Sequence, residues 1–213
     1  MLFYIIRHGE TDANLKGVIQ GRLDVPLNKN GEELALITGK AMKGIRFDRC
    51  ITSPLIRAYD TVKIVLRESG NSDTLIETDD RLMEMSFGVN EGKKLCSGVL
   101  PDEEAKKFFS DPFNFKGFPE GERIEEVMDR TQNFMKELSR RDDGLTYLIG
   151  IHGAALRSML NFLYDDPSDF WHGHVPYNCA VNIVEVRNGQ ITLKEDDKIY
   201  YDRSLIADRF KMS

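Results

Sequence analysis

The chain alternates between short apolar runs and longer segments whose apolar residues recur every three or four positions. Short apolar runs are typical of strands buried on both faces, and the longer pattern is typical of amphipathic helices. The predicted strands are Leu2–Ile6, Asp48–Thr52, Thr74–Thr78 and Leu145–Ile151. The predicted helices are Gly31–Lys43, Pro54–Glu68, Arg123–Arg141 and Ala154–Tyr164. This alternation indicates an α/β fold of three layers, with helices on both faces of a mostly parallel central sheet.

A different pattern follows the last predicted helix. Two strand-like segments, Val181–Val186 and Gln190–Lys194, flank the pair Asn188-Gly189. Asn-Gly is the pair that best tolerates the positive φ angles of a two-residue hairpin turn. The sequence therefore predicts an antiparallel hairpin at one edge of the sheet.

The composition indicates one globular domain. The 213 residues are 41% hydrophobic, enough for a single core, and no repeat, low-complexity stretch or linker divides them. We therefore expect one domain over residues 1–213. Acidic residues outnumber basic ones, 35 to 29, which gives a formal net charge of −6. Because the chain also lacks a run of lysines and arginines, nucleic acid is not an expected partner.

The first residues and the cysteines bear on cellular location. The apolar run before Arg7 is too short for the core of a signal peptide and has no basic leader, and no later segment reaches the length of a membrane span. We expect a cytoplasmic protein without a membrane partner. Cys50, Cys96 and Cys179 are few and widely spaced, which is typical of reduced structural thiols. The oligomeric state stays open, and a homodimer is one alternative.

Residues suited to phosphate chemistry follow three of the predicted strands. Residues 7–11 (RHGET) follow the first, residues 53–58 (SPLIRA) follow the second, and His152-Gly153 follows the last. Ligands of open α/β sheets bind beyond the carboxyl ends of the strands, so these segments should converge. The predicted pocket holds two arginines and two histidines, namely Arg7, His8, Arg57 and His152. Because guanidinium groups bind phosphate oxygens bidentately, a phosphoryl group is the expected ligand.

The same residues resemble the histidine phosphatase superfamily, which includes the cofactor-dependent phosphoglycerate mutases. Residues 7–11 resemble its nucleophile signature, and residues 53–58 resemble its second arginine motif. Shorter matches occur at Asn14, Gln20-Gly21, Pro26-Leu27-Asn28, Gly31, Leu82-Met83-Glu84, Phe87-Gly88, Glu91-Gly92 and His152-Gly153. The similarity follows the family's order from about residue 3 to residue 160, and it implies a phosphoglycerate mutase-like fold.

The resemblance implies roles for five residues. By it, His8 is the nucleophile, Glu84 is the proton donor, and Arg7, Arg57 and His152 bind the phosphoryl group. Attack by histidine requires a neutral ring with a free lone pair, a form that neighbouring arginines favour. Glu84 would protonate the departing oxygen and then activate water. Since the arginines supply the positive charge, we expect neither a metal nor a cofactor.

Departures from the family pattern are modest. Ile151 and Ala154 flank the second histidine where many relatives have serine and glycine, and Arg123 follows Gly121-Glu122 where serine is frequent. These changes preclude transfer of a substrate preference from any one relative.

Glu10 is a second candidate acid, but a carboxylate at a phosphate-facing turn would repel the substrate. We interpret Glu10 as a structural partner of an arginine.

Polar residues beside the nucleophile motif are candidates for substrate binding. Thr11, Asn14, Gln20 and Gly21 would supply hydroxyl, amide and backbone donors, and Gly153 would line the site beside the second histidine. The alternative is that these residues serve only the conformation of their loops.

An aromatic cluster lies farther along the chain. Residues 108–118 contain five phenylalanines among prolines and glycines, and they form either a lid over the pocket or a satellite core under a loop. Trp171, His172 and His174 have no second ligand pair at metal spacing, so we interpret them as packing and surface residues.

The predicted function is hydrolysis of a small phosphate monoester through a phosphohistidine. The main alternative is a cofactor-dependent phosphoglycerate mutase, which uses the same chemistry but excludes water. The interval between Glu84 and His152 is short for such a mutase, which favours the phosphatase. A non-catalytic module that binds a phosphorylated ligand would be expected to lack a catalytic residue, yet all five are present. A metallophosphatase would require carboxylate-rich spacing that the sequence lacks.

Overall fold

A computed structural model describes residues 1–206. Within them, six strands form one mixed sheet in the order β3-β2-β4-β1-β5-β6. The strands are β1 (Leu2–Arg7), β2 (Arg49–Thr52), β3 (Ile76–Thr78), β4 (Thr146–Ile151), β5 (Val181–Arg187) and β6 (Gln190–Lys198). Strands β1 to β4 run parallel, and β5 and β6 form an antiparallel hairpin at one edge. The predicted α/β class and edge hairpin are confirmed, whereas residues 207–213 of the predicted domain lie outside the described residues.

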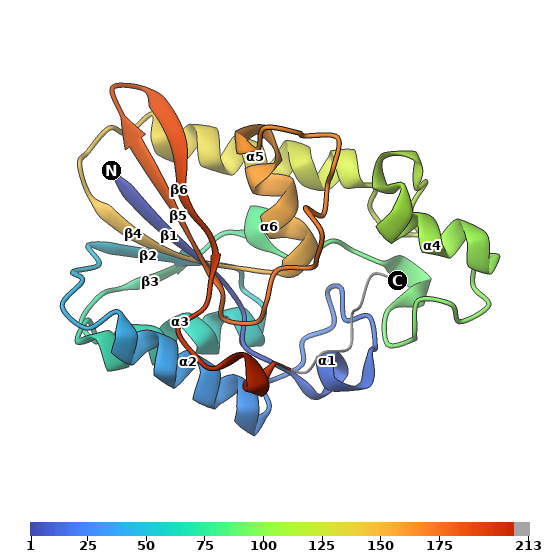
Figure 1. Ribbon diagram of the computed structural model, residues 1–213, viewed down its shortest axis with the longest axis horizontal. Helices are drawn as coiled ribbons and strands as arrows, with labels where there is room; N and C mark the ends of the chain where they lie inside the picture. Colours follow the sequence, from blue (N-terminus) through green and yellow to red (C-terminus); the bar gives the residue numbers. More distant parts are fainter. Residues whose placement is uncertain (207–213) are drawn as a thin grey trace.

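Helices cover both faces of this sheet. They are α1 (Asp12–Lys16), α2 (Lys29–Ala41), α3 (Ile56–Ser69), α4 (Asp102–Ser110), α5 (Ile124–Ser139) and α6 (Gly153–Leu160). Figure 1 shows α2 and α3 on one face and α5 and α6 on the other. Because successive strand residues point to opposite faces, Ile5 packs in the core beneath α5 and α6, and Ile6 packs in the core beneath α2 and α3.

Two helices were not predicted from the sequence. α1 is a short helix whose N-cap residue is Thr11, and the side chains of Thr11 and Asn14 form a capping box. α4 ends inside the aromatic segment 108–118, and its Phe108 is buried in the larger core. Both helices are too short to produce a strong apolar period, so tertiary packing decides that they form. The predicted helix at Pro54 begins later, at Ile56.

The register of the strands places the candidate site at their carboxyl ends. Arg7 of β1 lies opposite Ile151 of β4, and the His8 N–H donates to the Ile151 carbonyl at 2.9 Å. Each strand then leads directly to a predicted site histidine. β4 also packs closely against β2 and α3 at Gly150. A Cβ at this position would lie 2.3 Å from Thr52 Oγ1 and 2.6 Å from a Val62 methyl carbon, so glycine permits the contact.

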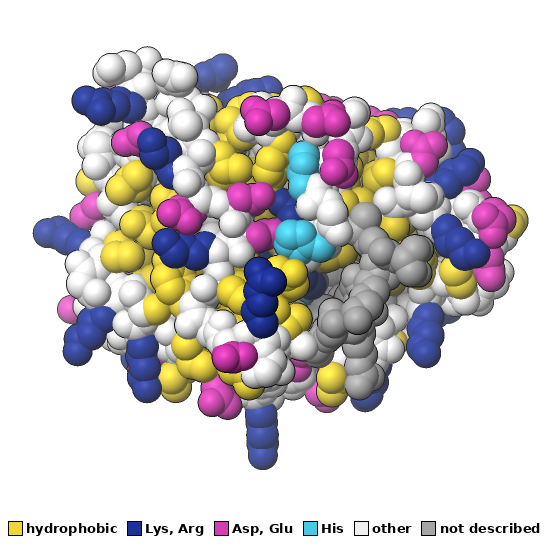
Figure 2. Space-filling model, viewed as in Figure 1, with side chains coloured by type: hydrophobic (Ala, Val, Ile, Leu, Met, Phe, Trp, Pro, Cys, Tyr) yellow, Lys and Arg dark blue, Asp and Glu magenta, His cyan; other side chains and the backbone are white. Residues whose placement is uncertain are grey.

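The surface is mixed in charge. On the face shown in Figure 2, lysine and arginine side chains are interspersed with aspartate and glutamate, without a basic patch over the described residues. Among residues 1–206, no helix combines the length and apolar character required to cross a membrane.

Candidate active site

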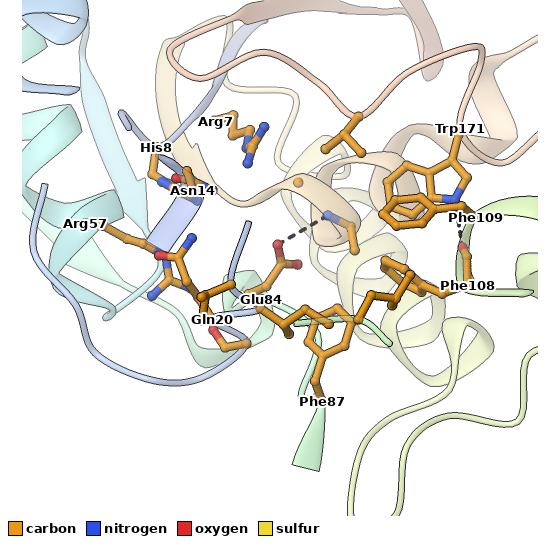
Figure 3. Close-up of a pocket in the computed structure, with 17 residues that line it drawn as sticks. Arg7, His8, Asn14, Gln20, Arg57, Glu84, Phe87, Phe108, Phe109 and Trp171 are labelled. Carbon is orange, nitrogen blue, oxygen red and sulfur yellow. Dashed lines mark hydrogen bonds between the residues drawn. The ribbon is translucent and has the colours of Figure 1, made fainter. Parts of the chain in front are cut away.

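The five predicted catalytic residues come from four parts of the chain. Arg7 ends β1 and His8 follows it, Arg57 lies in the first turn of α3, and His152 is the N-cap residue of α6. Glu84 lies between two short 3-10 helices. Figure 3 shows four of these side chains around one pocket, those of Arg7, His8, Arg57 and Glu84. The ring centroids of His8 and His152 are 5.1 Å apart.

One hydrogen bond fixes the tautomer of the buried His8 ring. His8 is 2% exposed, and its Nδ1 lies 2.7 Å from the Gly9 carbonyl oxygen. Because a carbonyl oxygen only accepts, Nδ1 carries the proton, and the neutral ring keeps a lone pair on Nε2. Burial lowers the pKa of His8 well below its ordinary value, and the charges of Arg57 and Arg7 lower it further. The ring is therefore neutral near pH 7, with Nε2 available for attack.

Two buried arginines beside this ring have unpaired donors. Arg57 donates from Nη1 to the Leu23 carbonyl and from Nη2 to the Gly21 carbonyl, both at 2.7 Å. Arg7 donates from Nη1 to the Pro176 carbonyl. The Nε atoms of both arginines are buried without a hydrogen-bond partner among the described residues. Burial lowers the pKa of Arg57 to about 10, so its guanidinium stays charged at neutral pH.

His152 offers a third unpaired donor. Its Nε2 lies 2.8 Å from Ser53 Oγ, which already accepts from the Leu55 N–H at 3.3 Å. If the Ser53 hydroxyl donates to Nε2, both groups are satisfied and Nδ1 carries the ring proton. That Nδ1 is buried without a partner among the described residues. Burial lowers the pKa of His152 well below its ordinary value, followed by the charges of Arg57 and of a protonated His8. His152 is therefore a neutral donor.

The Glu84 carboxyl group is docked at the start of α6. Its Oε1 accepts from the N–H groups of Met85 at 2.9 Å and Ala155 at 3.0 Å, and its Oε2 accepts from the Ala154 N–H at 3.3 Å. The last of these bonds is drawn in Figure 3. The first N–H groups of a helix have no partner within it, so a carboxylate is a suitable acceptor there. The start of α6 thus brings Glu84 next to His152.

The structure separates the predicted substrate-binding residues into two groups. Asn14, Gln20, Gly21 and Gly153 line the pocket. Thr11 does not line it and lies behind two of them: its hydroxyl accepts from the Asn14 N–H at 3.1 Å and donates to Gln20 Oε1 at 2.9 Å. Thr11 therefore supports the binding residues and is not placed to contact a ligand.

Glycine is required at position 21 of the pocket wall. Gly21 has a φ of +52°, and a Cβ there would lie 2.2 Å from Glu91 Oε1. That Glu91 oxygen accepts from the N–H groups of Arg22 and Phe87, both at 3.0 Å. Glu91 therefore joins the loop that binds Arg57 to the segment that follows Glu84.

The outer half of the pocket is apolar. It is lined by Val18, Ile19, Phe87, Leu95, Phe108, Phe109, Ala154, Trp171 and Val175. Trp171 was interpreted as a packing residue, but it also lines the pocket, and its Nε1 donates to the Phe108 carbonyl at 2.9 Å. In the aromatic cluster, Phe115 and Phe118 are buried in the larger core, whereas Phe108 and Phe109 reach the pocket. The cluster therefore belongs partly to the core and partly to the site.

Glu10 has an amide partner within the described part of the chain. Its side chain accepts from Asn28 Nδ2 at 2.8 Å, and the expected arginine partner is not found among residues 1–206. Asn28 in turn caps α2 by accepting from the Gly31 N–H at 2.8 Å. Glu10 is therefore structural, as expected, but it acts by fixing the start of a helix. Asn178 was not predicted, and its Nδ2 donates to the His8 carbonyl at 2.9 Å.

Among residues 1–206, no three His, Cys, Asp or Glu side chains are grouped so that they could hold a metal ion. His174 instead lies beside a carboxylate, with its Nε2 3.0 Å from Asp197 Oδ2.

Comparison with known proteins gives relatives of similar length. The chain is 32% identical to an uncharacterized phosphatase, PhoE, of Bacillus subtilis over 84% of this chain and 86% of that protein. Its structure resembles that of Bacillus stearothermophilus YhfR, with a TM-score of 0.85 and 30% identity over 93% and 97% of the two chains. It also resembles a phosphoglycerate mutase from Bacillus anthracis, with a TM-score of 0.80 and 26% identity over 93% of each chain.

The match to a family model extends over nearly the whole chain. Residues 3–197 match the model of the histidine phosphatase superfamily (branch 1), a region that includes every residue of the pocket described above. The solved structures share the fold, and the chain belongs to the histidine phosphatase superfamily (branch 1).

Proposed function

We propose that this protein is a phosphatase that hydrolyses small phosphate monoesters through a phosphohistidine at His8. The observation that carries the proposal is a neutral His8 ring whose Nε2 has no hydrogen-bond partner among residues 1–206, next to three buried donors that also lack one there. Those donors are Arg7 Nε, Arg57 Nε and His152 Nδ1. Unpaired buried donors are costly, and a phosphoryl group would satisfy them.

In the first step, His8 Nε2 attacks phosphorus, the N–P bond forms and the ester P–O bond breaks. The two arginines and His152 stabilise the charge on the phosphoryl oxygens. A free alkoxide is a poor leaving group, so the Glu84 carboxyl group transfers its proton to the departing oxygen. The products are the alcohol, the phosphohistidine and the Glu84 carboxylate.

In the second step, water replaces the alcohol. The Glu84 carboxylate accepts a proton from water, the oxygen of water attacks phosphorus, and the N–P bond breaks. Inorganic phosphate leaves, and His8 Nε2 and the Glu84 acid return to their starting forms. Arginine supplies the positive charge in both steps, so the mechanism uses no metal and no cofactor.

The apolar outer half of the pocket supports a substrate whose alcohol carries apolar surface. Such an alcohol would contact Phe109, Leu95 and Trp171 beyond the phosphoryl group. The described lining residues include no lysine, and no arginine beyond Arg7 and Arg57, to pair with a second anion. We therefore propose a small phosphorylated metabolite of the cytoplasm as the substrate, with a preference for apolar alcohols over phosphorylated acids.

A phosphoglycerate mutase is the second candidate, because the structure resembles one with a TM-score of 0.80. Incubation with 3-phosphoglycerate, with and without 2,3-bisphosphoglycerate as primer, separates the two functions. We expect inorganic phosphate as the main product, and faster release of phosphate from aryl esters in a screen of phosphorylated compounds. Much faster formation of 2-phosphoglycerate than of phosphate by the primed protein would replace the phosphatase with the mutase.

A further inference from the structure

Arg130, on α5, makes five hydrogen bonds through its guanidinium group. Its Nε and Nη2 donate to the two carboxylate oxygens of Glu122, at 2.9 and 3.0 Å. Nη1 donates to the carbonyl oxygens of Arg81 and Met83, at 2.8 and 2.7 Å. Nη2 also donates to the carbonyl oxygen of Glu84, at 3.1 Å. One side chain thus joins a partly buried carboxylate to the main chain that carries the proposed proton donor.

The segment around Glu84 has no regular structure of its own. It lies between the 3-10 helices Asp80–Leu82 and Gly88–Asn90, so its polar groups need partners from elsewhere. Glu122 supplies two of them, because its Oε2 accepts from the Ser86 N–H at 2.7 Å and its own N–H donates to the Ser86 carbonyl at 2.8 Å. The main chain is therefore fixed on both sides of Glu84.

The ion pair is partly buried and stays charged. The side chains of Arg130 and Glu122 are 16% and 17% exposed. Burial raises the pKa of Glu122, but the hydrogen bonds and charge of Arg130 outweigh it, so the pKa is lowered overall. Arg22 Nη2 also lies 3.1 Å from Glu122 Oε1. An apolar pair would fill this space but would leave the carbonyl groups unpaired, so the pair does more than pack.

We propose that Arg130 and Glu122 are positioning residues that set the direction of the Glu84 carboxyl group. The inference rests on the proposed function, in which Glu84 protonates the departing oxygen. The Glu84 side chain reaches from this fixed main chain to the N–H groups of Ala154 and Ala155. A shift of residues 81–86 would therefore misdirect the carboxyl group while the phosphate-binding donors stay in place. Proton transfer would weaken before phosphate binding does, since it requires hydrogen-bond geometry.

Arg130→Lys and Glu122→Gln test this role in the full chain. Lysine keeps the charge but cannot form the planar, bidentate pair, and glutamine keeps the shape of Glu122 without its charge. A general acid matters most for a basic leaving group, so kcat/KM is compared for an alkyl phosphate and for 4-nitrophenyl phosphate. We expect each variant to lose about tenfold or more on the alkyl ester and about twofold or less on the nitrophenyl ester.

Glu84→Gln is the reference variant and should show the same selective loss. The double variant should show the same ratio of losses on the two esters as Glu84→Gln alone. Arg130→Lys affects the alkyl ester only by displacing the Glu84 carboxyl group, which the double variant no longer has. Arg67→Lys is the matched control. The Arg67 side chain pairs with Glu68 at 2.8 Å on α3, outside the pocket lining and outside residues 81–86, so both esters should react at the parental rate.

The outcomes distinguish the two proposals. If Glu84→Gln is selective but Arg130→Lys and Glu122→Gln slow both esters equally, the positioning role is overturned and the proposed function stands. If Glu84→Gln itself slows both esters equally, the proposed role of Glu84 fails and this inference fails with it. If Arg130→Lys does not fold, Glu122→Gln tests the positioning role by itself, because it should show the same larger loss of kcat/KM on the alkyl ester than on the nitrophenyl ester.

Discussion

At the scale of single residues, the site combines a neutral nucleophile with fixed positive charge. Burial, followed by the charges of Arg57 and Arg7, lowers the pKa of His8 and keeps it unprotonated, and the two arginines also provide donors for a phosphoryl group. The Gly9 carbonyl orients the ring so that the proton lies on Nδ1, on the side away from the reacting lone pair of Nε2. Two arginines therefore prepare the nucleophile and the binding site at the same time.

Replacement of His8 by alanine should abolish turnover and phosphoenzyme formation together, because one atom is both nucleophile and carrier. We expect the rate to fall by at least about 10³-fold. Quenching the reaction with a radiolabelled phosphate ester in alkaline detergent, which preserves phosphohistidine, measures the phosphoenzyme, and its loss in acid identifies the N–P bond. His172→Ala, a histidine outside the pocket lining, should retain both. An acid-labile phosphoenzyme in His8→Ala would identify a different nucleophile.

At the scale of elements, β4 and α6 together position His152 and the Glu84 carboxyl group. β4 ends at Ile151, His152 caps α6, and the first N–H groups of α6 hold Glu84. The position of α6 relative to β1 therefore decides whether the acid faces the nucleophile. That position depends on close contact between β2 and β4, which Gly150 permits.

Gly150→Ala should destabilise the fold, because the new methyl group would collide with Thr52 Oγ1 and with Val62. Overpacking of this kind costs about 1–3 kcal/mol in the free energy of unfolding. Urea denaturation at pH 7 measures it. Combining the change with Thr52→Ala removes the nearest clashing atom, so the double variant should lose less than the sum of the two single changes. If the two losses in the free energy of unfolding simply add, the new methyl group does not collide with Thr52, and the overpacking would be contradicted.

At the scale of the whole molecule, buried neutral histidines link stability to pH. Burial, followed by the charge of Arg57, lowers the pKa values of both His8 and His152 below the ordinary histidine value. In the unfolded chain both rings take up protons near pH 6.5, whereas in the folded protein they stay neutral to lower pH. Below about pH 6.5 the unfolded state binds more protons than the folded state. The free energy of unfolding is therefore highest above this pH and decreases as the pH falls below it.

The free energy of unfolding should therefore decrease between pH 6.5 and pH 5, by about 1.4 kcal/mol per pH unit for each of these histidines. Urea titrations of the parent and of His8→Asn across this range measure the slope. The variant should have a slope smaller by about one proton. Identical slopes would mean that His8 takes up its proton in the folded protein as readily as in the unfolded chain.

The proposed mechanism needs no metal, because the positive charge comes from Arg7 on β1 and Arg57 on α3. We expect activity toward 4-nitrophenyl phosphate to survive prolonged dialysis against EDTA without change. Loss of activity that a divalent metal ion restores would contradict this mechanism.

The sequence alone was sufficient to predict the α/β class and the edge hairpin, and also that Arg7, His8 and Arg57 lie at one pocket, with the His152 ring next to that of His8. The reason is physical: strand and helix periods are local, and the carboxyl ends of parallel strands share one edge of a sheet. The prediction for Glu84 rests on family resemblance, together with a turn-rich segment of apolar neighbours that could bury its carboxyl group.

Tertiary structure decided the remaining features. The docking of Glu84 on α6, the amide partner of Glu10 and the support that Arg130 gives to residues 81–86 all join segments that are distant in the chain. The apolar half of the pocket likewise combines side chains from residues 18–19, 87, 95, 108–109, 154, 171 and 175. Such contacts depend on how helices and loops pack over the sheet, and that packing cannot be predicted from a local pattern of residues.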